Sequence, residues 1–123
     1  MASPIQIEIT ANFEANLESV RCFCHDMGKS DQYEKLLDEL FGNIIPNLQE
    51  FPRMGADFCS LPAGSVEVRR AQEKLRGRLQ ENMSIRQYQS REYVILYLLK
   101  ETTVSLLAIK HQRQLAYDMR KWD

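Results

Sequence analysis

The chain has 123 residues, 44% of them hydrophobic and 27% charged, with a formal net charge of -1. This length fits one domain with its own core, and the composition is that of a soluble globular protein and excludes a disordered or fibrous one. No apolar stretch is long enough to cross a bilayer and the N-terminus does not read as a secretory leader, so we expect a single cytoplasmic domain over residues 1–123.

The first predicted elements are a strand and a helix. Isoleucines alternate with polar residues over positions 5–9, which is the period of an edge or second strand with one face on the core. From position 13 to position 27 the apolar residues recur every three or four positions, which predicts a helix. Gly28 is a natural end for this helix, because glycine readily adopts the backbone conformation that follows a last turn.

The strongest helical pattern follows, over residues 33–48, where apolar side chains again recur at helical spacing. Asp31 and Glu34 are predicted to form a capping pair at its start. Pro46 lacks an N–H group and clashes with the preceding turn, so the helix should kink or loosen between Gly42 and Pro46. We expect the two helices to form an antiparallel hairpin.

The middle of the chain is predicted to be a loop and a short helix. Residues 51–64 contain two prolines and two glycines without a sustained period, which is typical of a loop. A short basic helix is expected at about 65–80, where apolar residues lie on one side and arginines and lysines lie off it, although Gly77 weakens the pattern.

The last third of the chain is predicted to be a sheet. Residues 83–89 alternate loosely, and residues 93–99 are an unbroken apolar run that indicates a central strand covered on both faces. Residues 104–109 predict another strand, joined to it by residues 100–102 at hairpin length. The fold class is therefore α+β: an N-terminal strand and a helical hairpin packed on a C-terminal antiparallel sheet of three to four strands, with the other sheet face left partly open.

Three local stretches follow one another along the chain: residues 47–55 (NLQEFPRMG), residues 91–97 (REYVILY) and residues 107–113 (LAIKHQR). In this order they resemble the helix exit, the penultimate strand and the last strand, here with a shortened His-x-Arg exit, of the RelE/ParE superfamily of bacterial toxins. The basic helix at 65–80 departs from the family pattern. The resemblance implies that the chain is the toxin of a type II toxin-antitoxin module. Such a toxin inhibits bacterial growth, and modules of this kind can stabilise plasmids.

Members of this family differ in their targets. RelE-like members cleave mRNA in the ribosomal A site with basic residues and a C-terminal tyrosine, and ParE-like members poison DNA gyrase. Lys110, His111, Arg113 and Tyr117 resemble the RelE-like cluster, in which His111 or Tyr117 would transfer protons and the cations would stabilise the phosphate. The strand at 93–99 carries no cation to bind phosphate, which favours a ParE-like gyrase inhibitor that is not an enzyme.

Two other functions stay open beside this one. The first is a metal-independent, ribosome-dependent endoribonuclease, and the second is a non-toxic scaffold or decayed toxin that acts only through its partner. The expected partners are a cognate antitoxin in a hetero-oligomer, DNA gyrase or the ribosome with its mRNA, and DNA only through the antitoxin. The side chains predicted to contact these partners are Arg69, Arg70, Arg76, Arg86, Arg91, Tyr93 and Tyr97.

Each of these residues also has a purely structural interpretation. A basic helix face is usually only solvated, Tyr93 and Tyr97 suit core packing, and Tyr117 suits packing of its ring with its hydroxyl in water. No cofactor and no metal is expected. Cys22 and Cys24 lie two apart on a helix and point about 200° apart, so they do not suit one zinc ion, and with Cys59 they are expected to be free thiols.

The charge is divided unevenly along the chain. Residues 1–63 hold 4 basic against 10 acidic residues, which is a net charge of -6, and residues 64–123 hold 12 basic against 7 acidic residues, which is +5. The second half could attract a polyanion or an acidic protein, and the two halves could attract each other between molecules.

Overall fold

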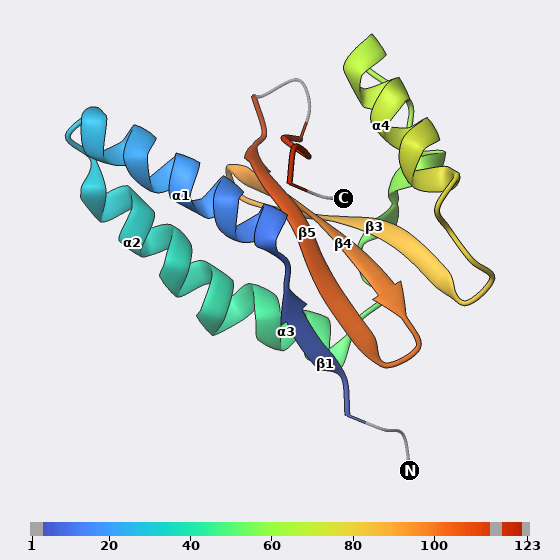
Figure 1. Cartoon of the computed structure of the whole chain (residues 1–123). Helices are drawn as coiled ribbons and strands as arrows, with labels where there is room; N and C mark the ends of the chain where they lie inside the picture. Colours follow the sequence, from blue (N-terminus) through green and yellow to red (C-terminus); the bar gives the residue numbers. More distant parts are fainter. Residues whose placement is uncertain (1–3, 114–116, 122–123) are drawn as a thin grey trace.

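The structure is a computed structural model that describes residues 4–113 and 117–121 (Figure 1). The N-terminal elements are β1 (Gln6–Ile9), α1 (Ala11–Asp26), α2 (Ser30–Glu39), a π-helical turn η1 (Leu40–Ile44) and α3 (Ile45–Glu50). The rest are β2 (Ala56–Asp57), a 3-10 turn η2 (Phe58–Ser60), α4 (Val66–Arg76), β3 (Met83–Ser90), β4 (Tyr93–Lys100) and β5 (Thr103–His111).

The strands form one mixed sheet in the order β1-β5-β4-β3-β2. Strands β3, β4 and β5 are the antiparallel C-terminal sheet that was predicted, and β1 is an edge strand that runs parallel to β5. The two-residue strand β2 pairs with β3 inside the predicted loop at 51–64, where it is too short to leave a period in the sequence. Among the described helices, none is long and apolar enough to cross a bilayer.

The helical hairpin forms as predicted, with two differences in detail. Lys29, not Asp31, precedes the first turn of α2 and gives it no side-chain cap, so the predicted capping pair of Asp31 and Glu34 is wrong. The loosening expected before Pro46 takes the form of η1, in which the Ile45 N–H bonds to the Leu40 carbonyl. A π-helical turn shifts this hydrogen-bond pattern by one residue just before the proline, which has no N–H to offer.

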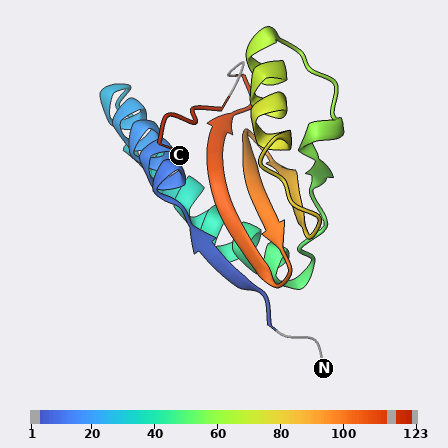
Figure 2. The ribbon, with the colours of Figure 1, turned by 45° about the vertical axis from the view of Figure 1, so that its right-hand side comes forward.

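Each face of the sheet carries its own apolar cluster, because successive residues of β4 point to opposite sides. On one face, α1, α2, η1 and α3 pack their apolar residues against the strands in a cluster made of Phe13, Leu36, Leu40, Ile44, Leu48, Ile95, Tyr97, Leu99, Val104, Leu106 and Ile109. The other face is covered by η2 and α4 (Figure 2). Its cluster contains Phe58, Leu75, Ile85, Val94, Leu96, Leu107, Ala108 and Tyr117. The prediction that this face is partly open is therefore wrong, because the apolar side of the basic helix α4 packs against it.

A bulge in β5 joins the sheet to α1. Leu96 pairs with Ala108 and Tyr97 pairs with Leu106, which leaves Leu107 as an extra residue. The Leu107 carbonyl accepts a hydrogen bond of 2.8 Å from Nδ2 of Asn12, which is buried on α1. One turn along α1, Oδ1 of the buried Asn16 accepts a bond of 3.0 Å from the Ile109 N–H. These two asparagines fix how α1 crosses the end of the sheet.

The loop after α3 is held by Tyr97, which is fully buried. The Tyr97 hydroxyl donates a 2.7 Å bond to the Pro52 carbonyl and accepts a 3.0 Å bond from the Gly55 N–H. Arg86 adds a 2.8 Å bond from Nε to the Gly55 carbonyl. The close approach at Gly55 explains why this position has no side chain: a Cβ atom there would lie 2.8 Å from both the Tyr97 hydroxyl and the Gln87 carbonyl.

Replacing Gly55 by alanine should lower the free energy of unfolding by about 2 to 3 kcal/mol, because a methyl group forced into this contact must displace backbone or a buried ring. Denaturant unfolding followed by circular dichroism measures the change. Gly42→Ala is the matched control, since a Cβ atom at Gly42 meets nothing within 4 Å. A loss of stability as large in Gly42→Ala as in Gly55→Ala would contradict the packing explanation.

Candidate functional site

The four residues predicted to form a nuclease centre lie on two faces of the sheet. Lys110 and His111 are neighbours in β5 and therefore point to opposite sides. The Lys110 ammonium lies over the ring of Tyr117, 5.3 Å from its centroid, on the α4 side. The His111 ring packs edge-on against Tyr93, with centroids 5.5 Å apart, on the α1 side, and its Nδ1 accepts a 3.1 Å bond from the Arg113 N–H. The structure thus separates Lys110 and Tyr117 from His111 and Arg113.

Tyr117 is a packed residue. Its ring is buried beside Phe58, at a centroid distance of 5.8 Å. Its hydroxyl was expected to reach water, but it donates a 2.7 Å hydrogen bond to Oε1 of Gln87. Burial raises the pKa of Tyr117 and lowers the pKa of Lys110. A phenol with a raised pKa is a poor base at neutral pH, so the environment of Tyr117 suits packing more than proton transfer.

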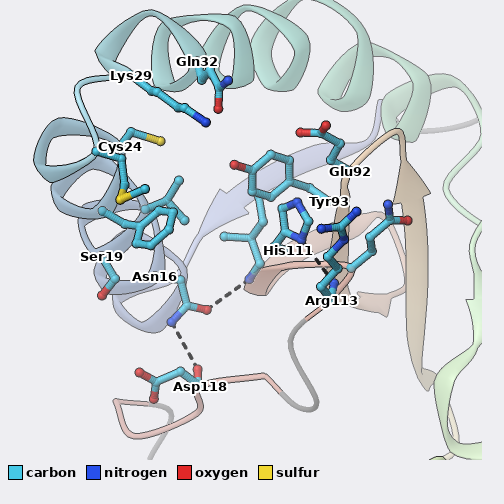
Figure 3. A pocket seen from close by; sticks show the side chains of 15 residues that line it. Asn16, Ser19, Cys24, Lys29, Gln32, Glu92, Tyr93, His111, Arg113 and Asp118 are labelled. Carbon is cyan, nitrogen blue, oxygen red and sulfur yellow. Dashed lines mark hydrogen bonds between the residues drawn. The ribbon is translucent and has the colours of Figure 1, made fainter.

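A groove opens on the α1 side of the sheet, and we call it the α1–β5 groove (Figure 3). Its main cavity, of about 740 Å³, lies between the second half of α1, the α1–α2 turn and the ends of β4 and β5. A smaller cavity, of about 370 Å³, continues between α2 and the β3–β4 turn and shares Gln32, Glu92 and Tyr93 with the first. Tyr93 therefore lines both cavities, which we treat together as the groove.

The wall that α1 contributes is apolar and open to solvent. Phe23 keeps 65% of its surface exposed and Met27, one turn further on, keeps 56%. Between them Cys24 is buried against the sheet side. Large apolar side chains exposed together in a concave place are typical of an interaction site, because burying them from water is favourable.

The opposite wall and the rim of the groove carry polar and charged side chains. Lys29 and Gln32 reach into the space from the α1–α2 side, and Tyr93, His111 and Arg113 face it from the sheet (Figure 3). Burial raises the pKa of the Tyr93 hydroxyl, which therefore stays protonated.

Two carboxylates also line the groove, Glu92 and Asp118. Asp118 is engaged by the Arg120 guanidinium at 2.7 Å, which also lowers the pKa of this carboxyl. The charge of Asp118 is thus largely balanced by Arg120, and Lys29 and Arg113 outnumber the remaining carboxylate of Glu92.

The residues predicted to contact a partner fall into three places. Arg91 and Tyr93 line the groove. Tyr97 is fully buried and has no surface left for a partner. Arg69 and Arg70 are exposed on α4, on the other side of the sheet.

Two other predicted arginines stabilise the protein's own loops. Arg86 bonds to the Gly55 carbonyl, and its second nitrogen donates a 3.0 Å bond to the Arg53 carbonyl. Arg76 donates a 2.6 Å bond to the Cys59 carbonyl.

Sequence reasoning missed Phe23 and the role of Met27 as groove residues. Met27 fits the apolar stripe of α1 and was counted as part of it, and Phe23 lies off that stripe. An aromatic residue outside the core-facing stripe of an amphipathic helix was the signal that could have indicated a second contact surface.

Neither a metal-binding group nor a match to a known family identifies the function of the site. The three cysteines are free thiols, and over residues 4–113 and 117–121 no group of three His, Cys, Asp or Glu side chains is placed to hold a metal ion. No protein-family model matches the chain, and no curated protein matches it.

Proposed function

We propose that the chain is the toxin of a type II toxin-antitoxin module that inhibits bacterial growth by binding DNA gyrase and is neutralised by a cognate antitoxin. Two things support the family: the three local resemblances to RelE/ParE toxins, and the order of elements, a first strand, a helical hairpin and a C-terminal antiparallel sheet. The proposal concerns a protein that acts by binding and performs no chemistry.

The observation that carries this choice is the separation of the predicted nuclease residues. A metal-free ribonuclease needs a base, an acid and cations around one phosphate. Lys110 with Tyr117 and His111 with Arg113 lie on opposite faces of the sheet. This arrangement supports binding over RNA cleavage.

The α1–β5 groove is the surface that we assign to a protein partner. Its exposed Phe23 and Met27 offer apolar area, and Lys29 and Arg113 would complement an acidic partner. Interfaces of this kind take most of their affinity from a few buried aromatic or arginine anchors.

Tyr117→Phe and Lys110→Gln should leave growth inhibition within about twofold of the wild type, because both residues lie away from the groove. Tyr117→Phe keeps the buried ring and removes only the hydrogen bond to Gln87, which costs about 1 kcal/mol. The measurement is growth after induced expression in a bacterial host, with mRNA cleavage followed in parallel. Under an endoribonuclease in which Tyr117 transfers the proton and Lys110 stabilises the phosphate, both substitutions would abolish mRNA cleavage and killing. Such a loss, in variants that still fold, would overturn the binding proposal.

Induced expression without the antitoxin also separates the remaining functions. We expect growth arrest with accumulated DNA breaks that mutations in gyrase relieve. A chain that arrests growth without DNA damage would contradict gyrase as its target. A harmless chain would contradict both toxin functions and favour a decayed toxin that acts only through its partner.

A further inference from the structure

The sheet face opposite the groove carries a helix with a basic outer surface. α4 turns Gln72 and Leu75 inward and leaves Arg69 and Arg70 exposed. Residues 66–78 hold five basic residues against two acidic ones, which is a net charge of +3. The resemblance to toxins assigns no role to this helix.

The helix is held firmly with this side outward. Ser65 caps its first turn, where its hydroxyl accepts a 3.1 Å bond from the Val68 N–H. Buried Gln72 donates bonds of 3.0 and 2.8 Å to the carbonyls of Phe58 and Leu61. The basic side chains are therefore carried on a fixed support and not on a mobile loop.

The negative charge lies on the other side of the sheet. Residues 11–39, which form α1, α2 and their turn, hold seven acidic residues against three basic ones, a net charge of -4. Figure 2 shows these helices and α4 on opposite faces of the sheet. The net charge of -1 thus hides a charge separation that would turn the α4 face toward a polyanion and helices α1 and α2, taken as a whole, away from it.

We propose that α4 contacts the phosphate backbone of duplex DNA through Arg69, Arg70 and Lys74. Arg69 and Arg70 are both exposed and project from α4 in directions about 100° apart, and duplex DNA offers a charge about every 1.7 Å of its axis, so the two side chains can reach different phosphates. The choice of DNA rests on the proposed function, because gyrase works on duplex DNA. Since α4 and the groove lie on opposite faces of the sheet, one molecule can bind gyrase through the groove and contact the DNA bound to gyrase through α4 at the same time.

A second copy of the chain is the competing occupant, because the acidic helices of one molecule could meet α4 of another. The net charge of -4 on that surface already includes Arg21 and Lys35, which contact Glu18 and Asp31. Duplex DNA carries a much denser negative charge, about one every 1.7 Å of its axis, and its condensed counterions are released on binding, which favours DNA.

The test is fluorescence anisotropy of a short labelled DNA duplex of mixed sequence with the full chain, between about 50 and 200 mM salt. Arg69→Gln/Arg70→Gln should weaken binding about tenfold or more at the lowest salt and reduce the slope of log affinity against log salt by up to about 1.8. Arg21→Gln/Lys100→Gln removes the same charge away from α4 and should stay within about twofold of wild type.

Several results would overturn the inference: no salt-dependent binding of DNA, an equal loss in the control variant, or tighter binding of RNA of the same length. Salt-sensitive self-association that the α4 variant abolishes, without DNA binding, would assign the surface to a second copy. A chain that binds DNA through α4 but is harmless on induction would refute only the proposed function. A toxic chain that does not bind DNA would refute only this inference.

Discussion

Phe23→Ser should raise the amount of protein needed for growth arrest at least about tenfold, because loss of an aromatic anchor at the centre of an interface costs about 2 kcal/mol or more. Phe23 is the most exposed large apolar residue of the groove, so little of its surface is needed for the fold of the free chain. The measurement is growth against inducer concentration, with protein amounts determined by immunoblot and folding checked by circular dichroism.

Phe41→Ser is the matched control for this experiment. Phe41 is 55% exposed, close to the 65% of Phe23, but it lies on η1 and lines neither cavity of the groove. We expect Phe41→Ser to arrest growth at the wild-type dose. If the two variants lost toxicity to the same extent, or if neither did, the groove would not be the binding surface.

The second large effect is expected on stability. Asn12→Ala should lower the free energy of unfolding by about 3 kcal/mol, because it leaves several backbone polar groups without their hydrogen-bond partner at a buried position. Asn12 is 2% exposed and donates to the carbonyls of Leu107 (2.8 Å) and Asp118 (2.9 Å). Its Oδ1 accepts a 3.0 Å bond from the Lys121 N–H. The substitution therefore releases both the β5 bulge and the tail.

Denaturant titration of Asn12→Ala and Asn43→Ala separates this effect from a general sensitivity to substitution. Asn43 is exposed and bonds only across a solvated helix turn to Glu39, at 2.8 Å. Its removal should change stability by less than about 0.5 kcal/mol. Equal stability of the two variants would show that the buried asparagine is not a main link between α1 and β5.

The central strand could be predicted from the sequence because its pattern is local. An unbroken apolar run indicates a strand buried on both faces. In β4, Ile95 and Tyr97 face the α1 side while Val94 and Leu96 face α4. The same local reasoning located α1, the hairpin and the break before Pro46.

Other features depend on where distant segments meet. The covered second face arises because Leu75 of α4 and Tyr117 of the tail reach the same strands from opposite directions along the chain. The groove lies between the second half of α1 and the end of β5, which are far apart in the chain. Neither arrangement leaves a local period in the sequence.

The separation of the nuclease candidates could have been predicted. Lys110 and His111 were expected at the end of a strand, and neighbours in a strand face opposite sides. Strand alternation alone therefore argued against a single centre that uses both. The grouping of Lys110, His111, Arg113 and Tyr117 followed linear spacing, which is a poor guide to distance on a sheet.

The most direct test of the account uses purified components. Wild-type chain, purified gyrase and supercoiled DNA are incubated, and DNA covalently linked to gyrase is measured after denaturation. We predict that cleaved complexes accumulate with the wild type and with Phe41→Ser, and fall at least about tenfold with Phe23→Ser. A folded wild-type chain that arrests growth but leaves gyrase unaffected, while cleaving mRNA on the ribosome, would contradict the account.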